Sequence, residues 1–126
     1  MDRTIVIRVG GIVLEAILYD SNTANTIWDV LPIKAHINTW GDEIYFAIPV
    51  GLELEQGQDI VNRGDLGFWP VGKAFCIFFG PTPMSSDNEI RPASSVNVFG
   101  RILGDATVLK GISSGAEVFV EKKETK

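Results

Sequence analysis

The sequence predicts a mainly β protein that folds as one domain. Paired runs of β-branched residues, joined by short turns, indicate antiparallel hairpins. One continuously apolar segment, Ala74–Phe79, is too short for a buried helix and is typical of a strand that is buried on both faces. A single convincing stretch, Thr23–Leu31, has apolar residues at helical spacing. We therefore expect hairpins around one core, with one substantial helix near the N-terminus.

Size, charge and cysteine content narrow the function classes. The 126 residues, 45% of them hydrophobic, suit one domain over residues 1–126. A net charge of -5 with scattered basic residues predicts neither a nucleic-acid partner nor an anionic membrane surface. The sequence has no signal-peptide pattern and no apolar run of the ~20 residues that span a membrane, so we expect a cytoplasmic protein. The single cysteine, Cys76, has apolar neighbours and is interpreted as a buried, inert thiol.

The first third of the chain predicts a hairpin followed by the helix. Arg3–Val9 and Ile12–Tyr19 are strand-like runs joined by two glycines, which suit a two-residue turn. Capping side chains around Ser21 precede the helix, and Pro32 prevents its continuation. The apolar stripe of this helix, which includes Trp28, is expected to pack on the core.

The rest of the chain predicts further strands, two irregular crossings and a second, short helix. Residues 51–63 are polar, and residues 80–92 are rich in turn-forming residues, as is typical of a functional loop. Asp105–Lys110 predicts a helix of one or two turns, and residues 122–126 a solvated tail. The further strands are expected at Ile33–Trp40, Glu43–Val50, Leu66–Trp69, Ala74–Phe79, Ser95–Leu103 and Glu117–Lys122.

Residues with catalytic or metal-binding potential are sparse. His36 is the only histidine, and the neighbouring carboxylates lack a recognised ligand spacing, so we expect no metal site. Glycine-rich phosphate loops do not occur in the sequence, and we expect no cofactor.

Aromatic side chains are the strongest functional signal. They crowd into adjacent predicted strands, and strand alternation turns several of them outward. Such a surface would suit an apolar ligand, an extended peptide or a second subunit.

Several motifs resemble those of the cyclophilins. Gly-Asp-Leu-Gly-Phe from Gly64 resembles a Gly-x-Leu-Ser-Met strand of that family, and Phe78-Phe79 resembles its Gln-Phe-Phe segment. Val-Phe-Gly-Arg-Ile from Val98 resembles the Val-Phe-Gly-Lys-Val of the C-terminal half. The resemblance implies a closed cyclophilin-like β-barrel of about eight strands, with one N-terminal helix and a short C-terminal helix.

A closer resemblance spans nearly the whole chain. Asn-Thr-Trp-Gly-Asp-Glu-Ile-Tyr-Phe from Asn38, Gly-Phe-Trp-Pro-Val-Gly-Lys-Ala from Gly67, and Phe-Phe-Gly-Pro-Thr-Pro-Met from Phe78 are similar to a small prokaryotic cyclophilin-like family of unassigned function.

The departures from true cyclophilins concern their active face. Phe46 stands where those enzymes place a catalytic arginine before a hydrophobic-Ile-Pro triplet, and Val96 stands where they have a histidine. Their proline-pocket tryptophan has no counterpart near Arg91. Trp69 matches a small alanine beside the peptide groove, and Phe79 matches the phenylalanine that floors the proline pocket. The resemblance therefore implies the fold without the usual chemistry.

Three functions stay open from the sequence. The first is a barrel that binds a small apolar ligand or peptide through Trp40, Tyr45, Phe46, Trp69 and Phe79. The second is a weak peptidyl-prolyl isomerase that uses another cation, Arg63 or Arg91, to stabilise the twisted amide. The third is an assembly protein whose outward aromatics form a homodimer interface.

Overall fold

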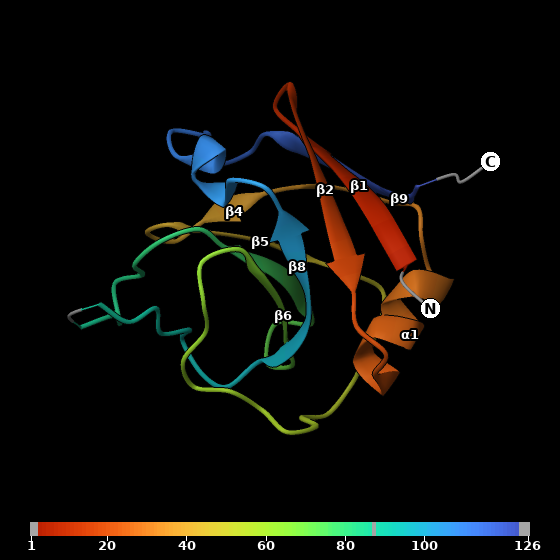
Figure 1. Cartoon of the computed structure of the whole chain (residues 1–126), viewed down its shortest axis with the longest axis horizontal. Coiled ribbons are helices and arrows are strands. Elements are labelled where there is room, and N and C mark those ends of the chain that lie inside the picture. Colours follow the sequence, from red (N-terminus) through yellow and green to blue (C-terminus); the bar gives the residue numbers. More distant parts are fainter. Residues whose placement is uncertain (1–2, 87, 124–126) are drawn as a thin grey trace.

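The computed structural model describes residues 3–86 and 88–123, and within them it has nine antiparallel strands in one nearly closed barrel (Figure 1). The strand order is β3-β9-β1-β2-β8-β6-β7-β5-β4, so the two edge strands follow each other directly in the chain. The strands are β1 (Arg3–Val9), β2 (Ile12–Leu18), β3 (Ile33–His36), β4 (Asn38–Thr39), β5 (Glu43–Ala47), β6 (Asp65–Trp69), β7 (Ala74–Phe78), β8 (Asn97–Leu103) and β9 (Glu117–Lys122). The predicted mainly β barrel is confirmed.

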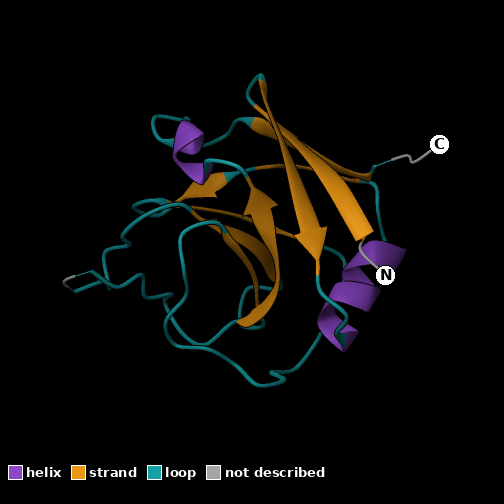
Figure 2. Cartoon of the chain, viewed as in Figure 1, coloured by secondary structure: helices purple, strands orange, loops and turns teal. Residues whose placement is uncertain are grey.

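Both predicted helices are present. Helix α1 (Asn22–Asp29) begins at Ser21, whose Oγ accepts a hydrogen bond from the backbone N–H of Ala24 at 3.1 Å. The 3-10 helix η1 (Ala106–Leu109) is capped by Asp105. The two helices lie on opposite sides of the barrel in the view of Figure 2. None of the helices in the described ranges is long and apolar enough to cross a membrane.

Several predicted strands are shorter than the sequence suggested, and two of them differ the most. The run Ile33–Trp40 divides into β3 and β4 because Ile37, which is 1% exposed, turns into the core between them. Strand β3 pairs with β9, whereas β4 pairs with β5. The run Glu43–Val50 leaves the ladder after Ala47, close to Pro49, which has no N–H to donate. Strand β9 ends at Lys122, and the remaining predicted tail residues 124–126 lie outside the described residues.

The barrel interior holds the main apolar core. Phe46, Phe68, Phe75 and Phe99 are fully buried in it. The ring of Phe75 stacks on Phe46 at 4.9 Å between centroids and meets Phe99 edge-on at 5.0 Å. Three β-strands thus contribute one continuous aromatic cluster to the centre.

A second apolar cluster covers the outer face of the sheet around β7. Alternation places Phe75 and Ile77 inside the barrel and Cys76 and Phe78 outside it, as expected for a strand buried on both faces. Val61, Ile90 and Val96 come from the two long loops and pack onto this outer face. The loops therefore build a layer outside the barrel.

Polar contacts fix the first of these loops. Asn97 is 2% exposed, and its Nδ2 donates to Thr23 Oγ1 and to the carbonyl of Glu53 at 3.0 and 2.9 Å. Its Oδ1 accepts from the backbone N–H of Glu55 at 2.7 Å. Isolated β-bridges, Gln58 to Val96 and Val61 to Ile90, then join the two loops to each other. The segment predicted as a simple crossing is therefore anchored to the barrel and to the second loop.

Candidate functional site

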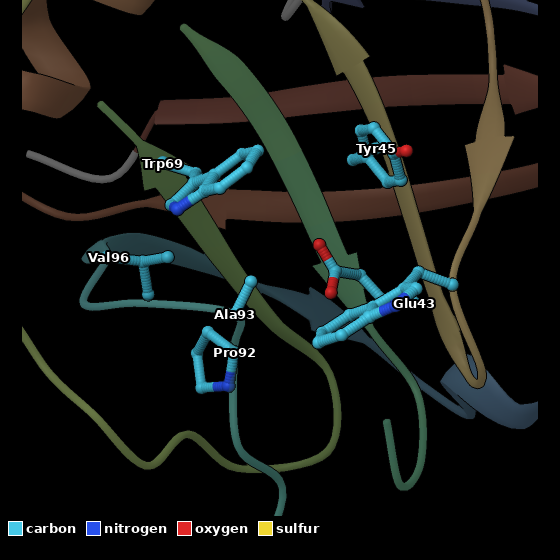
Figure 3. A pocket seen from close by; sticks show the side chains of 7 residues that line it. Glu43, Tyr45, Trp69, Pro92, Ala93 and Val96 are labelled. Atoms are coloured by element: carbon cyan, nitrogen blue, oxygen red, sulfur yellow. The ribbon is translucent and has the colours of Figure 1, made fainter. Parts of the chain in front are cut away.

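An apolar pocket opens on the outer face of the barrel, between the sheet and the second loop (Figure 3). Its volume is about 220 Å³. Three aromatic side chains, one carboxyl group and three residues of the loop form its walls. These are Trp40, Tyr45, Trp69, Glu43, Pro92, Ala93 and Val96.

Strand alternation brings the sheet residues to this face. Glu43 and Tyr45 are two positions apart on β5, so both point away from the barrel interior, as Figure 3 shows. Strand β7 lies between β5 and β6, and Trp69 stands at the end of β6. The backbone N–H of Trp40 donates to the carbonyl of Glu43 at 3.0 Å and closes the turn between β4 and β5.

Gly67 allows the loop to lie close to the sheet. It pairs with Cys76 on one side and Val98 on the other, at a bulge in the β6–β8 ladder. A Cβ atom at this position would stand 2.9 Å from Cγ2 of Val96 and 3.1 Å from Cε2 of Phe78. The missing side chain therefore lets Val96 reach the sheet and form one wall of the pocket.

Contacts at both ends of the indole hold Trp69 in place. Its Nε1 donates to Ser94 Oγ at 2.6 Å, which joins the strand to the second loop. A Cβ atom on Gly72, in the following turn, would stand 2.8 Å from Cε3 of the ring, so the turn backbone lies close against the indole. The ring is thus positioned before any ligand arrives.

Glu43 is a buried carboxyl group within this apolar pocket. The residue is 6% exposed, and its Oε1 has no hydrogen-bond partner among the described residues. Burial raises the pKa of Glu43 from 4.5 to about 7, and a hydrogen bond with the Cys76 thiol partly offsets that rise. The same thiol lies 3.9 Å from the carbonyl of Ala74, and its one proton can serve only one of these acceptors at a time.

The Cys76 thiol is a poor nucleophile in this setting. Burial raises the pKa of Cys76 well above its ordinary value, and the nearby charge of Glu43 raises it further. Thiolates are the reactive form of cysteine, so this side chain stays protonated and unreactive near neutral pH.

The structure brings together three of the seven residues that the sequence suggested. Trp40, Tyr45 and Trp69 line the pocket. Phe46 and Phe79 are instead 0% and 2% exposed in the barrel core, so neither reaches the pocket.

The two arginines lie elsewhere. The Nε of Arg63 donates to the carbonyl of Phe79 at 3.3 Å, and the residue lines a separate hollow with Pro81 and Ile90. The guanidinium of Arg91 forms an ion pair with Glu89 at 2.8 Å. Neither arginine lines the aromatic pocket.

Sequence reasoning missed Glu43 and the loop residues Pro92, Ala93 and Val96. A signal for Glu43 was present, because residues two apart on a strand share a face and Tyr45 was already named as a binding residue. Pro92 and Ala93 gave no comparable signal, since an irregular segment has no periodicity. Val96 was expected on a strand and matches the position of a cyclophilin active-face histidine, which was a signal for this site.

The fold and the whole sequence both identify the family. A family model described as cyclophilin-like matches residues 3–121. The chain belongs to the cyclophilin-like family. This cyclophilin-like barrel is also similar to a hypothetical protein from Archaeoglobus fulgidus with a known solution structure: 44% of residues are identical, the match covers 97% of this chain and 95% of the other, and the TM-score is 0.81. A search of curated proteins found no match.

The chemistry open to this cyclophilin-like pocket follows from its lining. No group of three or more histidine, cysteine or acidic side chains that could hold a metal ion occurs in residues 3–86 and 88–123. The pocket instead offers aromatic surface, one carboxyl group whose pKa lies near neutrality, and an indole N–H that is already bonded. Such a site suits recognition of an apolar body with one polar or charged group.

Proposed function

We propose that this cyclophilin-like barrel is a binding domain that takes a small apolar ligand, or one side chain of a peptide, in the outer-face pocket, without the arginine-based chemistry of cyclophilins. The observation that carries the proposal is the convergence of Trp40, Tyr45 and Trp69 on one hollow of about 220 Å³. Concave sites lined by aromatic side chains with a few polar groups are the usual form of small-molecule sites.

The volume limits the size of the occupant. It is smaller than the ~300 Å³ at the lower end for drug-sized ligands. It is several times the ~30 Å³ that one water molecule takes up in the liquid, so the pocket has room for a small organic group. A peptide would therefore place a single side chain in the pocket.

Replacing Trp69 by alanine is expected to weaken ligand binding by about tenfold or more, because stacking surface at one wall is lost. Neutral apolar fragments would be screened by the chemical shifts of the three indole N–H groups. Trp40 and Trp69 line the pocket, whereas Trp28 lies on α1 beside Arg3 and Lys122 and serves as an internal reference.

Val71→Ala is the control for this experiment, since Val71 is 75% exposed in the turn that follows Trp69. Binding of every recovered fragment with the same affinity in wild type and Trp69→Ala would refute the proposed site.

The alternative function is peptidyl-prolyl isomerisation. We expect the protein not to accelerate it, so that a proline peptide isomerises at the same rate with the protein as in buffer alone. Acceleration would need a cation beside the twisted amide. The guanidinium groups of Arg63 and Arg91 are bonded to the Phe79 carbonyl and to Glu89, outside the pocket lining. The assay would compare wild type with Arg63→Ala and Arg91→Ala. Acceleration that one of these variants loses would make the protein an enzyme with a relocated cation.

We place the binding role ahead of a homodimer formed through the same aromatics. The three rings surround a hollow, whereas a self-complementary interface needs a patch that matches its own copy across a twofold axis. The molar mass from light scattering distinguishes the two, because a homodimer has twice the mass of a single chain. We also propose a cytoplasmic location.

A further inference from the structure

The aromatic pocket contains a carboxyl group that forms no ion pair with the basic side chains in residues 3–86 and 88–123. Glu43 is 6% exposed, and its Oε1 lacks a hydrogen-bond partner among the described residues. None of the residues that line the pocket is a lysine or an arginine. In Figure 3 the carboxyl group points into the space between Trp69 and Ala93. A buried carboxylate without a counter-charge is costly, and a bound cation would remove that cost.

We propose that the pocket selects a small organic cation, an ammonium group on an apolar body, with the Glu43 carboxylate as its counter-ion and Trp40, Tyr45 and Trp69 as its aromatic walls. This inference rests on the proposed binding function and specifies the chemical class of the ligand.

The combination of groups favours an organic cation over a metal ion. Aromatic faces attract cations through the quadrupole of the ring, with tryptophan the strongest, and aromatic cages are a general means of holding alkylated ammonium groups. A metal ion would need several oxygen, nitrogen or sulfur ligands, whereas this lining supplies one carboxyl group and the Tyr45 hydroxyl among apolar surfaces. The net charge of -5 also favours the approach of a cation.

Binding of a cation should depend on pH through Glu43. Its carboxyl group has a pKa of about 7, so it is mostly protonated at about pH 6 and mostly charged at about pH 8. Among the described residues, the Cys76 thiol on β7 is hydrogen-bonded to this carboxyl group, and Tyr45 on β5 contributes to the same lining. Burial and the charge of Glu43 raise the pKa of Cys76 well above its ordinary value, so the thiol stays neutral in this range. Affinity for a permanently charged ammonium ion should therefore rise with pH.

The test compares choline with 3,3-dimethylbutan-1-ol, in which a carbon atom replaces the charged nitrogen and the shape is kept. Each compound would be titrated into the full chain at about pH 6 and pH 8, with the indole N–H shifts of Trp40 and Trp69 as the readout and Trp28 as the reference. We expect choline to bind about tenfold more tightly than the alcohol at pH 8 and to lose most of this preference at pH 6.

Two variants assign the preference to one carboxyl group. Glu43→Gln keeps the shape of the side chain and should reduce the preference for choline to about twofold or less at both pH values. Glu53→Gln removes the same charge from an exposed position outside the pocket and should leave the preference intact.

The outcomes separate this inference from the proposed function. Equal affinity for choline and the alcohol would overturn the cation inference and support the apolar pocket. The cation inference would also be overturned if choline shifted neither the Trp40 nor the Trp69 indole N–H signal while neutral fragments still shifted them. If neither choline nor any neutral fragment shifts Trp40 and Trp69, both the inference and the proposed function fall.

Discussion

Glu43→Gln is expected to abolish most of the decrease in unfolding free energy that the wild-type protein shows between about pH 5 and pH 8. Burial raises the pKa of Glu43 from 4.5 to about 7, so in this window the folded protein holds a proton that the unfolded chain has released. The free energy of unfolding therefore falls as the pH rises, by up to about 3 kcal/mol once the pH exceeds 7. Below about pH 4.5 both states are protonated, and this group contributes no further change.

Urea unfolding at several pH values measures this effect. The wild type should show a falling free energy of unfolding, whereas Glu43→Gln should give a flatter curve because an amide does not titrate. Glu53→Gln, at an exposed position, is the matched control and should keep the wild-type slope. If Glu43→Gln also kept that slope, the ionisation of Glu43 would not be the cause.

Phe75→Ala is expected to lower the free energy of unfolding by about 3–5 kcal/mol. Phe75 is 0% exposed on β7, and its ring contacts both Phe46 and Phe99 at centroid distances of 4.9 and 5.0 Å. Truncation would remove both aromatic contacts and leave a cavity in the centre of the barrel.

Phe119→Ala provides the comparison for this large effect. Phe119 is only half-buried on β9, so its truncation should cost distinctly less. Urea unfolding at one pH measures both variants. Equal losses for the two would contradict the central position that the structure gives to Phe75.

Local patterns were sufficient for most of the barrel. The glycine pair after Val9 fixed the first hairpin, because two residues with positive φ suit a tight turn between strands. The apolar run on β7 indicated a strand buried on both faces, and the structure has one core inside it and another outside. Ser21 and Pro32 bracketed helix α1 to within a few residues.

Contacts between distant segments decided the remaining features of the fold. The expected strand is divided at Ile37 because its first half pairs with β9 and its second half pairs with β5. No local pattern carries that information. The burial of Asn97 also depends on distant segments, since its hydrogen-bond partners Thr23 and Glu55 lie 74 and 42 residues away in the chain.

For the candidate site, the sequence by itself named the pocket residues Trp40, Tyr45 and Trp69 among its candidate binders, because aromatic side chains crowd adjacent expected strands and alternation turns several of them outward. It could not distinguish Phe46 and Phe79, which belong to the barrel core. Only the tertiary structure decided that the second loop lies over the sheet, converts an aromatic surface into a pocket and buries Glu43 within it. The physical reason is that the free energy of a carboxyl group depends on what excludes water from it, and here residues about fifty positions further along the chain do so.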